Sequence, residues 1–262
     1  MPDVNLLDIK KRVTAANQTR KITRTMELIA SSRLQRSKAQ LTHYQVWMRH
    51  LRDAACCLPD QYFEPLDEPL PGSKRAYIVM GGSQGLSGSY SPSLLQYADP
   101  PATDQVILAV GSAAEIYFPE AHSLLGDEIP SADYAQTITS TALSLYERKA
   151  VCAVLMVYTK GSRHVTEQLL PLVRQHAEQN VAVIAEPSAR SLHPVLYREY
   201  VEALVHEAHL QAFLAEQIAR VSAMDNATQN ADKIIDDLRA TYNRIRQSSI
   251  TQEILAVGNA AR

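Results

Sequence analysis

The sequence lacks any apolar stretch long enough to cross a bilayer. Its longest uninterrupted apolar run is Val151–Tyr158, whereas a membrane-spanning helix needs about 20 such residues. The first residues also lack the basic and then apolar layout of a secretory leader, and the early acidic residues do not suit an organelle transit peptide. Hydrophobic residues make up 46% and charged residues 21% of the chain. This composition is ordinary for a soluble protein and argues against wholesale disorder.

Cysteine is scarce, and the arrangement of the few cysteines excludes a metal centre of the usual kind. The adjacent Cys56 and Cys57, together with Cys152, show no metal-ligand spacing and are expected to be reduced thiols in a cytosolic protein. His206 and His209 lie three residues apart without further ligands nearby. Nothing in the chain brings together a nucleophile, a base and an orienting group. We therefore expect no metal, no cofactor and no catalytic residue.

Glycine and proline are absent from two long runs near the ends of the chain. Of the 22 such residues, 20 lie between Pro59 and Pro194, which leaves Asp3–Leu58 and Val195–Val257 with none. Short alternating elements need turn residues at each connection, so each terminal run is predicted to be one continuous helix. At 1.5 Å per residue these helices would be about 84 and 95 Å long. That is several times the diameter of a small domain, so they cannot both be ordinary core helices.

Apolar residues in both terminal runs follow helical spacing. They step by three and four along a single line. In the first run the line comprises Leu6, Ile9, Val13 and Ala16, and it resumes at Leu41, Tyr44, Met48, Leu51, Ala55 and Leu58; in the last run it comprises Val221, Met224, Thr228, Ala231, Ile235, Leu238, Tyr242 and Ile245. No third long helix is available to cover these lines. The pattern predicts an antiparallel two-helix coiled coil formed by the two ends of the chain.

Charge is divided unevenly along the chain. The net charge is +7 over Asp3–Leu58, −7 over Pro59–Pro194 and −3 over Val195–Val257, which favours pairing of the two terminal helices. The basic excess is either a solvated face or a partner surface. A nucleic-acid binder using the basic helix is one alternative, but no recognised reading motif accompanies the basic cluster, which comprises Lys10, Lys11, Arg12, Arg20, Lys21, Arg24, Arg33, Arg36 and Lys38.

The middle of the chain alternates strand-like and helix-like stretches. Continuous apolar runs, typical of strands buried on both faces of a parallel sheet, occur at Ala76–Met80, Gln105–Val110, Val151–Thr159 and Val181–Ala185. Helices are predicted between them at Ser91–Ala98, Ser112–Phe118 and Ala132–Lys149. The fold class is therefore α/β: a mainly parallel, Rossmann-like domain inserted between the two long helices. The predicted parts are 1–58, 59–194 and 195–262, with linkers at Pro59–Pro71 and Glu186–Pro194.

A glycine-rich turn, Gly81–Ser89, follows the first predicted strand and precedes a helix, where a phosphate-binding loop would stand. Its spacing does not match G-x-G-x-x-G, a P-loop or G-x-S-x-G. We interpret it as a tight structural turn. The alternative is a nucleotide site in an α/β enzyme that uses the helices as dimerisation arms.

Both ends of the chain carry motifs that resemble a known family. Ile22–Leu34, ITRTMELIASSRL, resembles the N-terminal helix of the gamma subunit of F-type ATP synthases, whose pattern is close to I-T-K-A-M-x-M-V-A-A-S-K. Ala223–Ala231 and Tyr242–Ile254, AMDNATQNA and YNRIRQSSITQEI, look like the C-terminal signature of that family. The resemblance covers the whole chain in order, from the first helix through the α/β domain to the last helix.

This resemblance implies a non-catalytic rotor. The gamma subunit is the central stalk inside the hexamer of alpha and beta subunits, and its α/β domain lies at the foot against epsilon and the membrane ring of c subunits. Rotation driven by the ring changes the nucleotide affinity of the catalytic sites on the beta subunits. The chain is short for the family and lacks the paired-cysteine insert of the chloroplast type. A bacterial enzyme is therefore expected, with the subunit peripheral on the cytoplasmic face of the cell membrane.

The resemblance also implies which residues touch partners. Arg24, Met26 and Arg33 are expected to face the beta-subunit lever, and Glu186 matches a glutamate near the foot. The beta-subunit catch loops are expected to meet Arg246, Gln247, Thr251 and Glu253. The chain departs from the family after the first strand, where Ser83–Gly88 replaces Asp-Lys/Arg-Gly-Leu-Cys-Gly. This change loses two charges and a thiol, and it puts in doubt any polar contact of that turn with epsilon or the helices.

Overall fold

The computed structural model describes residues 6–56, 74–98, 105–124, 129–172, 186 and 188–260. Contacts between residues divide the chain into two compact units. The first, here called the helical unit, contains the residues up to Ser31 and those from Arg220 onward. The second, the sheet unit, contains Ser32–Ala219. The predicted linker at Pro59–Pro71 and the predicted strand at Val181–Ala185 lie outside the described residues.

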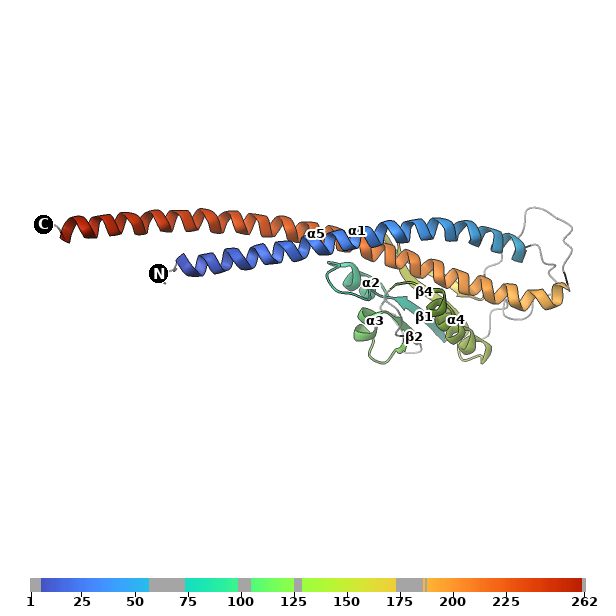
Figure 1. The fold of residues 1–262 in the computed structure, drawn as a ribbon. Coiled ribbons are helices and arrows are strands. Elements are labelled where there is room, and N and C mark those ends of the chain that lie inside the picture. The colour runs from blue at the N-terminus through green and yellow to red at the C-terminus, as the bar shows by residue number, and fades with distance from the viewer. Residues whose placement is uncertain are drawn as a thin grey trace. The chain divides into compact units, whose positions relative to one another are not determined.

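Two long helices occupy the ends of the chain, as predicted (Figure 1). Helix α1 comprises Leu6–Cys56 and helix α5 comprises Ala189–Ala260. The predicted linker ending at Pro194 was wrong, because α5 begins at Ala189 and contains that proline. Ser188 starts the helix: its carbonyl accepts from the Leu192 amide at 3.1 Å and its hydroxyl accepts from the Ser191 amide at 3.3 Å. Proline removes one backbone hydrogen bond, and near the end of a 72-residue helix this loss is tolerated.

Within the helical unit, α1 and α5 run antiparallel. Arg20 contacts Asp232 at 3.0 Å, and the hydroxyls of Thr23 and Thr228 lie 2.8 Å apart. Residue numbers therefore rise along one helix as they fall along the other. The buried side chains of this unit, Ile9, Ala30, Met224, Ala231 and Ile235, include small residues that let the two helices approach closely. The predicted coiled-coil line of α5 is confirmed at three of these positions.

The sheet unit contains five strands in the order β3-β2-β1-β4-β5. Their bounds are β1 Arg75–Met80, β2 Gln105–Val110, β3 His122–Leu124, β4 Ala153–Lys160 and β5 Arg163–Leu170. Strands β3, β2, β1 and β4 are parallel, and β5 pairs antiparallel with β4. The sequence prediction located β1, β2 and β4. It missed the short β3 and the polar β5, RHVTEQLL, which has no continuous apolar run.

Helices cover both faces of this sheet. Their bounds are α2 Tyr90–Ala98, α3 Ser112–Tyr117 and α4 Ala132–Glu147. One buried cluster joins Ile78 and Met80 of β1 to Ile138 of α4 and to Val201 of α5. The other joins Val79 of β1 to α2 and α3. Successive residues of β1 thus enter opposite cores, which explains why a strand of this kind reads as a continuous apolar run. In this unit too, α1 contacts α5: the Tyr44 hydroxyl donates to the Ala203 carbonyl, and the Gln45 side chain donates to the Glu207 carboxylate.

Candidate partner-contact surfaces

In the helical unit, α1 carries an exposed apolar ridge. Ile22 is 60% exposed, Met26 36% and Ile29 45%. Their spacing of four and three places them on one face of the helix, and this face is not the one that packs on α5. Exposed large apolar side chains gathered in one place are typical of a protein contact surface, so Met26 lies where a partner could reach it. Arg24, two residues before Met26, faces another side of the helix; it is exposed and pairs with Glu27 at 2.9 Å.

The sequence prediction named Met26 as a contact residue and did not name its two isoleucine neighbours. Ile22 and Ile29 lie within the motif Ile22–Leu34. The signal was available, because the residues share the i, i+4, i+7 spacing and lie off the coiled-coil line. What the sequence could not show was that none of the described residues of the helical unit covers this face.

The last part of α5 presents a second exposed surface. Arg246, Gln247 and Thr251 are exposed, and the Thr251 hydroxyl donates to the Gln247 carbonyl at 2.9 Å. The side chain of Glu253 lies outside the described residues. Helix α1 begins at Leu6, and the contact of Arg20 with Asp232 places Leu6 opposite about residue 246 of α5. Beyond that point the described residues offer no neighbouring helix, and Ile254, Leu255 and Val257 are 66%, 61% and 71% exposed.

Arg33 differs from Arg24 and Met26 because it contacts the glycine-rich turn. It lies in the sheet unit, half-buried, and its guanidinium donates to the Gln84 side-chain oxygen at 3.1 Å. Arg24 and Met26 belong to the helical unit. Its contact with a beta subunit stays a prediction.

The first two glycines of the glycine-rich turn are held by close contacts. The Gly81 amide donates to Val110 at 2.8 Å, and the Gly82 carbonyl accepts from Ala113 at 3.0 Å. A methyl group on Gly82 would lie 2.6 Å from the Ser91 hydroxyl and 3.2 Å from the Glu216 carboxylate. A phosphate loop needs free amides and open space. Because this turn packs closely against its neighbours instead, its geometry favours the structural interpretation over the nucleotide site.

The same turn connects both long helices within the sheet unit. The Gln84 side chain accepts from Arg33 of α1, while the Gln84 amide donates to the Glu216 carboxylate of α5 at 3.3 Å. Glu216 is 4% exposed. The departure from the family pattern at Ser83–Gly88 raised doubt about polar contacts of this turn with the helices. The structure shows that such contacts exist, made by a neutral glutamine.

The remaining predicted positions hold no chemical centre. Glu186 is exposed, and its foot contact stays a prediction. Burial lowers the pKa of both His206 and His209, to about 4 for His209, so both imidazoles are uncharged at neutral pH. Among the described residues no group of three or more metal-ligating side chains occurs. None of the described helices is long and apolar enough to cross a membrane.

Sequence comparison finds relatives that match over nearly the whole chain. A family model described as ATP synthase matches residues 5–262. An ATP synthase gamma chain from Ruminiclostridium cellulolyticum is 30% identical over 287 residues, covering 98% of this chain and 98% of the relative. One from Streptococcus mutans is 30% identical over 281 residues, covering 97% and 96%. The resemblance carried by the two terminal motifs therefore extends through the middle of the chain.

Solved structures show the same fold at lower identity. The rotor of the Euglena gracilis mitochondrial ATP synthase aligns with a TM-score of 0.67 at 15% identity, covering 94% of this chain and 98% of that chain. A chain from the central stalk and c-ring of the Tetrahymena thermophila mitochondrial enzyme aligns with a TM-score of 0.58 at 17% identity, covering 79% and 99%. The predicted fold class, long terminal helices packed together around an inserted mainly parallel sheet, is confirmed.

Proposed function

Because the chain belongs to the ATP synthase gamma chain family, we propose that it is the central-stalk rotor of an F-type ATP synthase. It couples ion-driven rotation of the membrane c ring to ATP synthesis or hydrolysis at the beta-subunit sites. It is a non-catalytic subunit, and its partners are the alpha and beta subunits of the catalytic head, the epsilon subunit and the ring of c subunits.

The observation that carries the proposal is the pair of helices in the helical unit. A shaft has to transmit torque without bending at a weak point, and glycine or an internal proline would provide such a point. Helix α1 has neither. In α5 the proline lies in the second turn, and the one glycine, Gly258, is two residues from the end of the helix. The two helices are also linked across their contact by Thr23 with Thr228 and by Arg20 with Asp232. Each helix therefore supports the other against twisting.

The contact surfaces of the helical unit suit a bearing that moves. The ridge of Ile22, Met26 and Ile29 offers apolar area without directional bonds. Exposed ion pairs contribute about 0–1 kcal/mol each, so partners can form and break them with Arg24 or Arg246 at each step of rotation. We propose that Arg24, Met26 and Arg33 face the beta-subunit lever. Four residues of α5 face the catch loops: Arg246, Gln247, Thr251 and Glu253.

The same proposal gives each part of the chain a role. Residues 1–58 and 195–262 form the shaft, and residues 59–194 form the foot, where Glu186 contacts the c ring or epsilon. The turn at Gln84 ties the foot to both helices. Since the curated relatives above are bacterial, we place the subunit on the cytoplasmic face of a bacterial cell membrane. It is peripheral there and held through the complex.

Reconstitution tests the proposal. Purified alpha and beta subunits are assembled with or without the full chain, and steady-state ATP hydrolysis is measured. We expect sustained turnover only when the chain is present. A second assembly uses the chain with Ile22→Gln, which removes apolar area from the exposed ridge without touching the packed face. We expect this variant to assemble and the complex to hydrolyse ATP more slowly. Turnover that is independent of the chain refutes the assignment.

A further inference from the structure

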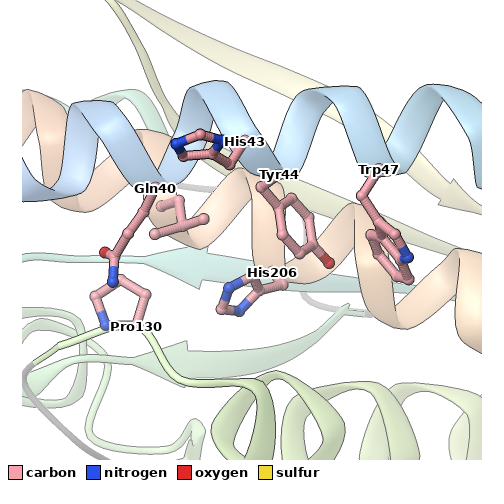
Figure 2. A pocket seen from close by; sticks show the side chains of 7 residues that line it. Gln40, His43, Tyr44, Trp47, Pro130 and His206 are labelled. Atoms are coloured by element: carbon pink, nitrogen blue, oxygen red, sulfur yellow. The ribbon is translucent and has the colours of Figure 1, made fainter.

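A recess of about 400 Å³ lies in the sheet unit between α1, α5 and the segment before α4. Helix α1 contributes Gln40, His43, Tyr44 and Trp47, whose spacing of three, four and seven places them on one face. Helix α5 contributes His206 and Leu210. Figure 2 shows Tyr44 and His206 close together, with Trp47 beside them on the same helix as Tyr44. None of these residues belongs to the contact surfaces proposed for the rotor.

Aromatic rings line this recess, and one of these rings is partly exposed to solvent. The rings of Tyr44 and Trp47 are 5.2 Å apart and tilted by 49°, while Tyr44 and His206 are 4.7 Å apart. The Tyr44 hydroxyl donates to the Ala203 carbonyl at 3.4 Å, which holds this ring against α5. Trp47 is 45% exposed, so a large part of the indole is available. Faces of tryptophan and tyrosine attract cations because their π systems are negative there.

Carboxylates lie near the recess without lining it. Glu202 and Glu199 precede His206 by four and seven residues and so share its face of α5. Burial raises the pKa of Tyr44, and the charges of Glu202, Glu207 and Glu199 raise it further. Glu207 accepts from the side chains of Gln45 and Gln211, at 3.2 Å each, and is thereby held in place.

The charges that act on Glu202 are mostly negative. Arg198 offsets part of the charge of Glu202, whereas Glu199 and Asp133 add to the negative potential there. Burial lowers the pKa of His206, so this imidazole adds no positive charge at neutral pH. An aliphatic side chain would fill the recess without using the carboxylates. A planar guanidinium can stack on the rings and pair with the carboxylates at the same time.

We propose that this recess binds an arginine or lysine side chain presented by another protein. The occupant is a basic residue on an exposed segment of its partner, with arginine preferred because of its planar group. The proposal goes beyond the rotor function and does not depend on it, since the recess is formed by this chain alone. The binding proposal can therefore fail while the rotor assignment holds, and the rotor assignment can fail while the binding proposal holds.

Trp47 provides the test, because it is the only tryptophan in the chain. The full chain at pH 8 is titrated with acetyl-Gly-Arg-Gly-amide, and in parallel with the glutamine peptide acetyl-Gly-Gln-Gly-amide, while the emission of Trp47 is recorded. We expect a saturable change with the arginine peptide in the millimolar range. The glutamine peptide should bind at least five-fold more weakly, and added salt should weaken arginine binding.

Two variants locate the effect. Glu202→Gln removes one carboxylate beside the rings and should weaken arginine binding about three- to ten-fold, whereas Glu120→Gln, on an exposed turn after α3, should leave it unchanged. Circular dichroism confirms that both variants are folded. Equal binding of the two peptides, or an equal effect of the two variants, overturns the proposal in favour of non-selective docking. No change in emission with the arginine peptide up to 10 mM also overturns it.

Discussion

A disulfide between the two helices of the helical unit should form and leave activity intact. The change is Thr23→Cys with Thr228→Cys in a chain whose three native cysteines are replaced by serine. The two hydroxyl oxygens are 2.8 Å apart, and a disulfide needs a sulfur separation near 2.05 Å with Cβ atoms about 3.5–4.5 Å apart. Small adjustments of two side chains are therefore enough. Loss of the hydroxyl contact in the reduced form should cost about 1 kcal/mol.

The size of the stabilisation follows from the length of chain that the bond encloses. About 200 residues separate the two positions, so the chain-entropy relation gives ~5 kcal/mol of stabilisation in the oxidised form. For a chain of this length that corresponds to a rise in Tm of roughly 10 °C. Non-reducing electrophoresis measures the bond, and thermal unfolding with and without reductant measures its effect.

A matched control decides whether the antiparallel register is right. Thr25 lies two residues from Thr23 on α1 and is exposed, so its side chain faces away from that of Thr23. The pair Thr25→Cys with Thr228→Cys should not cross-link. In reconstituted complexes the Thr23 pair should retain most of the ATPase activity when oxidised, because both helices turn together. Equal cross-linking of the two pairs would refute the register, and loss of activity on oxidation would refute a shaft that rotates as one body.

Three further outcomes are expected. Gly111→Ala should destabilise the sheet unit by roughly 2–4 kcal/mol, because φ is +89° there and a methyl group would lie 2.6 Å from the Gly81 carbonyl oxygen, just after β1; Gly85→Ala, in open space, should cost under 1 kcal/mol by urea unfolding. Burial lowers the pKa of His209 to about 4, below the ordinary value near 6.5. The unfolded state therefore binds more protons between these values, and stability should fall by up to about 3 kcal/mol as the pH drops from 6.5 to 4; His209→Gln should flatten this fall, and an unchanged pH profile would contradict the buried neutral imidazole. Arg246→Ala and Gln247→Ala should lower ATP turnover while assembly, measured by gel filtration, persists; unchanged rates in both would remove these residues from the catch.

Much of the fold could be predicted because many of its helices and strands depend on residues that are close together in the sequence. The absence of glycine and proline predicted α1 and most of α5, and continuous apolar runs predicted β1, β2 and β4. Pro194 misled the prediction of where α5 starts, since proline ends a helix in general but is tolerated near its beginning. Strand β5 was missed because an antiparallel partner at the edge of a sheet can be polar on one side, so its sequence carries no continuous apolar signal.

The surface residues divide in the same way. Met26 and Arg246 were predicted as contact residues from motifs, and the structure places both in exposed positions. The recess around Tyr44 and Trp47 could not be predicted, because it depends on α5 lying beside α1 in one particular register. The role of Gln84 could not be predicted either. A glutamine in a glycine-rich turn gives no indication that it meets an arginine of one long helix and a glutamate of the other.

Direct observation of rotation tests the central claim. Alpha and beta subunits are assembled with the full chain and fixed to a surface, and a bead is attached to the sheet unit through a single introduced cysteine. On addition of ATP, the account predicts that the bead turns in one direction in discrete steps and stops when ATP is exhausted. A bead that stays still while the same complexes hydrolyse ATP at full rate would contradict the account, because catalysis would then proceed without this chain turning.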